Sequence, residues 1–141
     1  MNLFSDLQIV DSGKNQKSPV EIYSKGLIAQ ETGEYFQSIR LYRSSLSLNQ
    51  DYLDPIVGLA QVFYELGEYE EALFHVKRAN QLGQELSVIV LEAEILLKLN
   101  KFSEAQDLLV TVLSQEPNNL QAILGMARLK QLSGNYLHAI D

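Results

Sequence analysis

Residues 54–79 read DPIVGLAQVFYELGEYEEALFHVKRA, and this stretch decides the fold. Apolar side chains recur there at helical spacing both before and after Gly67, which indicates two helices. Asp54-Pro55 is typical of a helix start, because proline suits the first helical turn. The stretch therefore predicts a hairpin of two helices with a sharp turn at Gly67, where glycine adopts a positive φ at little cost.

The features of this hairpin recur along the chain with a period of 33 or 34 residues. The turn column holds Gly33, Gly67, Asn100 and Gly134; an aromatic column follows with Tyr35, Tyr69, Phe102 and Tyr136, and a small-residue column with Ser38, Ala72, Ala105 and Ala139. Before each turn stand an isoleucine and a second small residue, namely Ile22, Ile56, Ile89 and Ile123, and Gly26, Ala60, Ala93 and Ala127. Such a period indicates a repeat protein, and the small residues are expected where two helices approach closely.

The register predicts an all-α fold, an α-α superhelix (solenoid) of antiparallel helix-turn-helix repeats. The first helices are predicted at 19–32, 53–66, 86–99 and 119–132, and the second helices at 35–48, 69–82 and 102–114. The repeat domain, residues 19–141, then holds about three and a half repeats, at 19–52, 53–85, 86–119 and 120–141. The fourth repeat is expected to be truncated, because its second helix begins near Tyr136.

Further predictions concern the two ends of the repeat domain. In the N-terminal segment 1–18, the apolar residues Leu3, Phe4, Leu7 and Val10 share one helical face before a polar linker. This predicts a short helix or strap docked on the first repeat or in the groove of a neighbouring copy. At the other end, the fourth first helix carries Ile123, Met126, Ala127 and Leu129 with little chain to cover them. An open apolar face of this kind predicts a homo-oligomer formed through the truncated C-terminal end.

Composition excludes several classes of function. The 141 residues include 11 basic and 18 acidic ones, giving a formal net charge of −7 without the clustered Lys and Arg that nucleic-acid binding requires. The same balance argues against a membrane surface and against RNA-binding helical repeats. The chain has no cysteine, no secretory signal at its start and no apolar run of membrane-spanning length, which together predict a cytoplasmic protein.

The sequence predicts no catalytic residue, metal or cofactor, and therefore no enzyme. Its two histidines, His75 and His138, lie 63 residues apart in non-adjacent repeats, without an evident partner ligand or orienting acid. Ser12-Gly13-Lys14 lacks the earlier glycine and the flanking elements of a phosphate-binding loop.

The columns resemble those of the tetratricopeptide repeat family. The second repeat matches the family most fully, with Ile56-x2-Leu59-Ala60-x2-Phe63 followed by Gly67, Tyr69, Ala72 and Val76, and the third keeps Ala93, Ala105, Leu109 and Pro117. The resemblance extends over about residues 19–141. The chain departs from the family pattern because no repeat has the tryptophan, Ser38 replaces alanine, and Lys25 and Glu92 replace leucine.

The resemblance implies a concave groove lined by the first helices, where partners bind as extended or helical peptides. The residues expected to face it are Tyr23, Leu27, Val57, Gln61, Tyr64, Val90, Glu94, Leu97, Leu124 and Arg128, together with Val20, Gln30, Asp54, Lys98, Gln121 and Gln131. This mixture suits apolar anchors combined with orienting hydrogen bonds.

Some family members bind a chaperone's terminal carboxylate with lysine, asparagine and arginine. The matching positions here hold Tyr23, Leu27, Gly58, Ser87 and Leu91. None of these side chains suits the task, so a chaperone tail is not the expected partner.

Three functions remain open at this point. The first is a protein–protein interaction scaffold that binds a peptide or helix of a partner protein in the groove, and the mixed groove row favours it. The second is a structural role, as a self-associating segment of a solenoid. The third is the docking arm of a longer protein whose catalytic domain lies beyond residue 141.

Overall fold

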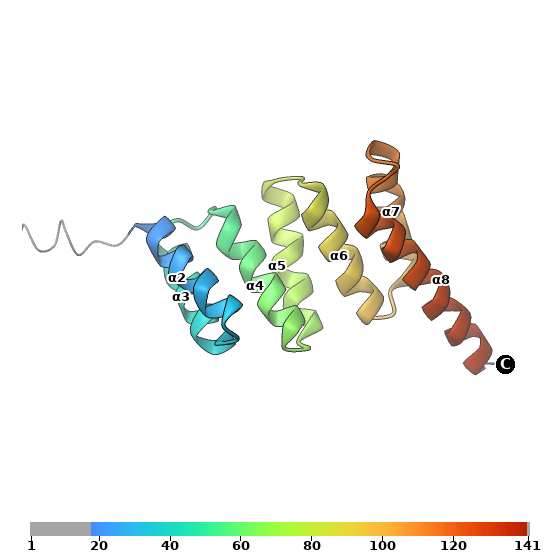
Figure 1. The fold of residues 1–141 in the computed structure, drawn as a ribbon, viewed down its shortest axis with the longest axis horizontal. Coiled ribbons are helices and arrows are strands. Elements are labelled where there is room, and N and C mark those ends of the chain that lie inside the picture. Colours follow the sequence, from blue (N-terminus) through green and yellow to red (C-terminus); the bar gives the residue numbers. More distant parts are fainter. Residues whose placement is uncertain (1–17, 141) are drawn as a thin grey trace, which may run out of the picture. The chain divides into compact units, whose positions relative to one another are not determined.

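The computed structural model describes residues 18–140, with side chains as far as Gly134, and these residues form helices and no strand (Figure 1). The helices are α2 (Pro19–Glu31), α3 (Tyr35–Leu48), α4 (Leu53–Glu65), α5 (Tyr69–Leu82), α6 (Leu86–Lys98), α7 (Phe102–Gln115) and α8 (Leu120–Ile140). The bounds of α2 to α7 agree with the predicted ranges to within about one residue. The predicted N-terminal docked helix lies outside the described residues.

The first helix begins as the sequence predicts. Ser18 precedes α2, and its Oγ accepts a hydrogen bond of 3.1 Å from the N–H of Glu21. Pro19 occupies the first helical position, where the missing N–H costs nothing. Ser18 therefore satisfies one of the N–H groups that a helix start leaves without a partner.

Three of the four turn-column residues end a first helix in the left-handed conformation. The angle φ is +82° at Gly33, +77° at Gly67 and +60° at Asn100. In each turn the following N–H donates to the carbonyl five residues back, as Glu68 does to Phe63 at 2.8 Å. This is the Schellman motif, which satisfies the free carbonyls of a helix end. The predicted positive φ is thus confirmed at these three turns.

The chain divides into two compact units, Met1–Pro55 and Ile56–Asp141, and each is described by itself. The first unit contains α2, α3 and the first residues of α4. The second contains the rest of α4 and all of α5 to α8.

In the first unit, side-chain hydrogen bonds join α2 to α3. Ser38 Oγ donates to the carbonyl of Gly26 at 3.0 Å, and Ser45 Oγ donates to the carbonyl of Pro19 at 2.7 Å. The two serines lie seven residues apart in α3, and their acceptors lie seven residues apart in α2 in the reverse order. The two helices therefore run antiparallel. Both serines are buried, and the bonds compensate for removing their hydroxyls from water.

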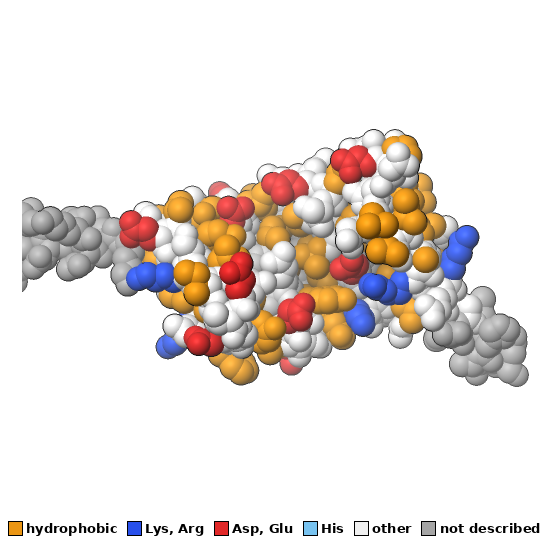
Figure 2. Space-filling model, in the orientation of Figure 1, with side chains coloured by type: hydrophobic (Ala, Val, Ile, Leu, Met, Phe, Trp, Pro, Cys, Tyr) orange, Lys and Arg blue, Asp and Glu red, His pale blue; other side chains and the backbone are white. Residues whose placement is uncertain are grey.

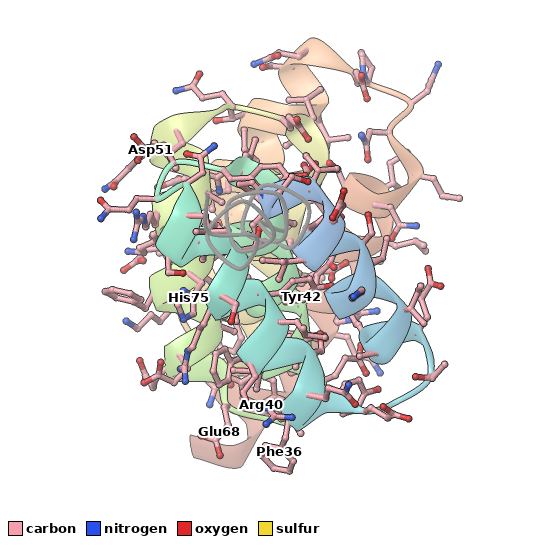
Figure 3. All side chains as sticks on the ribbon, turned by 90° about the vertical axis from the view of Figure 1, so that its left-hand side faces the viewer. Phe36, Arg40, Tyr42, Asp51, Glu68 and His75 are labelled. Atoms are coloured by element: carbon pink, nitrogen blue, oxygen red, sulfur yellow. The ribbon has the colours of Figure 1, made fainter. Side chains whose placement is uncertain are left out.

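Tyr42 fills the interior of this hairpin and explains the glycine at position 26. A Cβ on Gly26 would lie 2.7 Å from Tyr42 Cε1, closer than side chains pack. The Tyr42 hydroxyl donates to Gln30 Oε1 at 2.5 Å, and burial raises the pKa of Tyr42 from 10.0 to about 12. Figure 3 shows Tyr42 inside the hairpin, whereas Phe36 points outward and is 78% exposed.

In the second unit, α6 is the central helix and packs against α5, α7 and α8. Neighbours on several sides explain why it is apolar almost all round; its buried residues are Val88, Val90, Ala93, Ile95, Leu96 and Leu97. Gly125 marks a close approach of α8 to α7, because a Cβ there would lie 2.9 Å from Leu109 Cδ2. The sequence pattern did not predict this contact.

The predicted turn at Gly134 is wrong. Helix α8 continues from Leu120 to Ile140, so the residues expected to start a second helix near Tyr136 extend the first helix instead. Extending an existing helix adds one hydrogen bond for each residue, whereas a separate helix of a few residues would have to be nucleated at a cost. Gly134 accordingly lacks the positive φ of Gly33 and Gly67.

Candidate functional site

A cavity of about 470 Å³ opens on the second unit, and we call it the groove cavity. It is lined by Val57 and Gln61 of α4, by Leu86, Ser87, Val88, Val90, Leu91 and Glu94 of α6, and by Glu116, Asn119 and Gln121 at the α7–α8 junction. The lining combines apolar side chains with amides, a hydroxyl and carboxylates. Its volume lies within the roughly 300–1,000 Å³ that is usual for binding sites.

Helical spacing brings these residues to one face. Val57 and Gln61 are four residues apart on α4, and Ser87, Leu91 and Glu94 follow a similar spacing on α6. Residues three or four apart are neighbours on a helix surface. Both helices are first helices of their repeats, the helices that the resemblance implies should line a groove.

Glu94 belongs both to the groove cavity and to a cluster of three polar residues. Burial is the main cause that raises the pKa of Glu94, and the positive charge of Arg128 opposes the rise. Burial also raises the pKa of Tyr64, where the charge of Glu94 adds to the rise and that of Arg128 opposes it. Tyr64, Glu94 and Arg128 therefore lie close together although they come from α4, α6 and α8.

Asn119 fixes the rim of the groove cavity where α8 begins. Its Oδ1 accepts a hydrogen bond of 3.0 Å from the N–H of Ala122, as a capping residue does. Its Nδ2 donates to Glu116 Oε2 at 2.9 Å. One side chain therefore both starts α8 and orients the carboxylate of Glu116 at the rim.

The structure brings together six of the ten predicted groove residues. Val57, Gln61, Val90 and Glu94 line the groove cavity, and Tyr64 and Arg128 join Glu94 in the polar cluster. Leu124 lies on α8 and is 48% exposed, outside the cavity lining. Leu97 is only 1% exposed and packs in the core around α6, so it offers a partner no surface.

The remaining two predicted residues, Tyr23 and Leu27, belong to the first unit. The Tyr23 ring stacks on Tyr42 with centroids 5.7 Å apart and meets Tyr52 edge-on at 5.6 Å. Burial raises the pKa of Tyr23, and the charge of Asp54 adds to the rise. Tyr23 thus packs against other tyrosines of the first unit.

Several residues of the groove cavity were not predicted: Leu86, Val88, Glu116 and Asn119. Ser87 and Leu91 were weighed only as positions for carboxylate binding. Glu116 and Asn119 flank Pro117, which marks a boundary between repeats, and a junction that leads into a first helix can reach the groove rim. That signal was present in the sequence as Pro117-Asn118-Asn119.

A second, more apolar cavity of about 380 Å³ lies against α8 and is called the α8 cavity. It is lined by Leu113, Ile123, Met126, Ala127 and Lys130. Ala127 is exposed, whereas its column partners Ala60 and Ala93 are 0% exposed. The expected open face is thus present at Ile123 and Ala127, while Leu129 is covered at 7% exposure. Figure 2 shows hydrophobic side chains over the first turns of α8.

His75 has a packing role. Its ring lies parallel to Phe63 with centroids 5.4 Å apart and meets Phe74 edge-on at 5.2 Å. The side chain of His138 lies outside the described residues. Among the residues that the structure does describe, no three His, Asp or Glu side chains are grouped as a metal site would require.

Residues 40–112, just over half of the chain, match the family described as Anaphase-promoting complex, cyclosome, subunit 3, which is of the tetratricopeptide type. The chain belongs to this tetratricopeptide repeat family. The hairpins that carry the repeated columns are therefore tetratricopeptide repeats, and the groove cavity is formed by their first helices and the α7–α8 junction.

Curated relatives match part of these tetratricopeptide repeats. Photosystem I assembly protein Ycf3 of Synechococcus elongatus is 28% identical over 83 residues, which is 57% of this chain and 48% of that protein. The chain thus spans about half the length of the curated relatives it matches.

Solved structures share the fold. A tetratricopeptide repeat protein from Parabacteroides merdae has a TM-score of 0.80 at 20% identity, covering 94% of this chain and 53% of that one. The first repeat domain of Spaghetti (RPAP3), bound to the HSP90 peptide SRMEEVD, has a TM-score of 0.75 at 20% identity, covering 85% and 94%. The predicted all-α helical repeat solenoid is confirmed. Across the described part of the chain, no helix has both the length and the apolar character to cross a membrane.

Proposed function

We propose that this chain is a protein-interaction scaffold whose groove cavity binds an extended or helical segment of a partner protein. The observation that carries the proposal is the lining of the cavity, in which apolar and hydrogen-bonding side chains from the first helices α4, α6 and α8 converge. Partner segments bind such grooves through a few buried apolar anchors and are oriented by polar contacts. Val57 and Leu91 supply the apolar surface, and Gln61 and Gln121 supply amides.

The comparisons support a scaffold more than a catalyst. The matched family and the cyanobacterial relative are both named for multi-subunit complexes, which favours a role in assembling a complex. The Spaghetti domain holds a peptide, and we extend to this chain only the mode of binding. We propose protein or peptide partners, and no catalytic step.

The test compares two substitutions of an apolar side chain by glutamine, one inside the groove cavity and one outside its lining. Peptides selected from a random displayed library against the whole chain would be measured against Leu91→Gln, in the groove cavity, and Phe74→Gln, which is 64% exposed on α5. We expect Leu91→Gln to weaken binding roughly 10- to 30-fold, as removal of an apolar anchor does, and Phe74→Gln to leave it unchanged. Both variants should melt like the parent chain. Binding that depends on Phe74 and not on Leu91 would contradict the proposal.

The α8 cavity favours a second candidate function, self-association with another copy of the chain. In the second and third repeats the small residue at this position is fully buried, but Ala127 is exposed beside Ile123, which is 44% exposed. Light scattering over a concentration series would detect a dimer. Ile123→Gln should then shift the chain toward monomer, whereas Val110→Gln, at a 52% exposed site on α7, should not. A chain that stays monomeric at high concentration would exclude this candidate.

A further inference from the structure

The charges that line the groove cavity are all of one sign. Of its lining residues only Glu94 and Glu116 are charged, and both are acidic. The positive charge nearest to Glu94 in the polar cluster is Arg128, which lies on α8 outside the lining. A partner that enters the cavity therefore meets carboxylates beside apolar side chains.

When no partner is bound, the surroundings of Glu94 disfavour its charged form. It is half-buried, and removal from water raises its pKa, so its charged form is less favourable than that of an exposed glutamate. The charge of Arg128 only partly offsets this. A cationic group of a partner that entered the cavity would supply the missing compensation.

The surroundings of Glu94 suit a long basic side chain. Leu91 lies one helical turn before Glu94 and is only half-buried, so it presents apolar surface on which the methylene stem of a lysine or arginine could pack. Gln61 and Ser87 add neutral oxygens that can accept hydrogen bonds from the charged head. An acidic tail, in contrast, would meet two carboxylates of its own sign.

We infer that the partner segment carries a lysine or arginine next to its apolar anchors and that Glu94 binds this basic side chain. The inference rests on the proposed peptide-binding function of the groove cavity. It makes Glu94 the residue that determines specificity, whereas Leu91 contributes to the affinity for every peptide.

The probes are eight-residue peptides of leucine and alanine that differ at one central position, which holds lysine, norleucine or glutamate. Norleucine keeps the lysine stem and removes the charge. By fluorescence anisotropy at low salt, we expect the lysine peptide to bind roughly 5- to 10-fold more tightly than the norleucine peptide, and the glutamate peptide to bind most weakly. Raising the salt concentration should reduce the lysine preference, since salt screens exposed charges.

Matched variants separate the charge of Glu94 from that of the surface. Glu94→Gln should make the lysine and norleucine peptides bind equally. Glu92→Gln, the same change on another face of α6 and outside the cavity lining, should keep the full lysine preference. Arg128→Gln should strengthen lysine binding, because it removes a competing positive charge near Glu94.

The outcomes distinguish this inference from the proposed function. Equal binding of lysine and norleucine peptides by the parent chain, with both lost in Leu91→Gln, would overturn the inference and leave the groove function standing. A lysine preference that survives Glu94→Gln would also overturn it. If none of the three peptides binds, or if Leu91→Gln changes nothing, the proposed function and the inference fail together.

Discussion

The α2–α3 hairpin and the α6–α7 hairpin occupy the same register with different interiors. At three corresponding second-helix positions the first hairpin has Ser38, Tyr42 and Ser45, and the other has Ala105, Leu109 and Val112. All six side chains are 0% exposed. The first set donates hydrogen bonds to α2, whereas the second set has only apolar surface to contribute.

The turn therefore sets the geometry of the hairpin, while the side chains that fill its interior can vary. Both hairpins turn through a left-handed residue, Gly33 or Asn100, with the same Schellman hydrogen bonds. In each hairpin, a small residue of the first helix is matched to the large side chain of the second helix that packs beside it. Tyr42 requires a glycine at position 26, whereas Leu109 is accompanied by Ala93.

The largest expected effect is on the apolar hairpin. Leu109→Ala should lower the free energy of unfolding by about 2–5 kcal/mol, because it removes a fully buried side chain and leaves a cavity. Tyr42→Phe removes only the hydroxyl that donates to Gln30, and should cost about 1 kcal/mol. Urea unfolding of both variants measures the difference. Equal losses would mean that the two interiors do not differ as the structure indicates.

The second effect depends on pH and belongs to the polar hairpin alone. Because burial raises the pKa of folded Tyr42 to about 12 from 10.0, the unfolded chain ionises this tyrosine first. The stability linked to Tyr42 is therefore complete below pH 10 and lost as the pH rises through about 12. The loss should be roughly 2–3 kcal/mol, at about 1.4 kcal/mol for each pKa unit.

The measurement is the free energy of unfolding between pH 9 and pH 12 for the parent chain and for Tyr42→Phe. The difference between the two curves isolates Tyr42 from the other tyrosines and lysines. Parallel curves over this range would contradict the burial of the Tyr42 hydroxyl.

The third effect tests the pairing of the interiors. Gly26→Ala should cost about 1–3 kcal/mol, because the new Cβ would lie 2.7 Å from Tyr42 Cε1. Adding Tyr42→Leu creates the alanine–leucine pair of the third repeat and should recover part of this loss. A double variant whose losses simply add would show that positions 26 and 42 are not coupled.

The sequence predicted the parts of the fold that depend on local chemistry. A positive φ restricts the turn to glycine or asparagine, so Gly33, Gly67 and Asn100 were visible as a column. The pairing of Gly26 with Tyr42 was not visible, since it depends on which side chain fills the interior. The turn at Gly134 was predicted wrongly because the column does not show whether enough chain packs back to sustain a separate helix.

The site was predicted less completely, and α6 shows why. Leu91 and Leu97 are both leucines of a first helix, but Leu91 lines the groove cavity and Leu97 is buried in the core. Helix α6 has neighbours on several sides, so periodicity alone does not identify its groove face. The position of Glu94 was predicted, whereas its closeness to Arg128 and Tyr64 required the packing of three helices.

The smallest expected effect separates function from stability at Glu94. Since burial raises the folded pKa of Glu94, its contribution to stability is present at low pH and lost as the pH rises through that pKa. Glu94→Gln should therefore keep or slightly raise the free energy of unfolding at pH 7, while it removes the preference for lysine peptides. A clear loss of stability in thermal unfolding would instead assign Glu94 a structural role.

The most direct test of the account is to locate a bound peptide by nuclear magnetic resonance. The lysine peptide would be titrated into isotopically labelled whole chain, and the amide shifts followed residue by residue. We expect the shifts to concentrate at Gln61, Leu91 and Asn119 around the groove cavity and to be small at Phe74 and Val110 on the second helices. Shifts centred on Phe74 and Val110, with Gln61 and Leu91 unaffected, would contradict the claim that the groove cavity is the binding site.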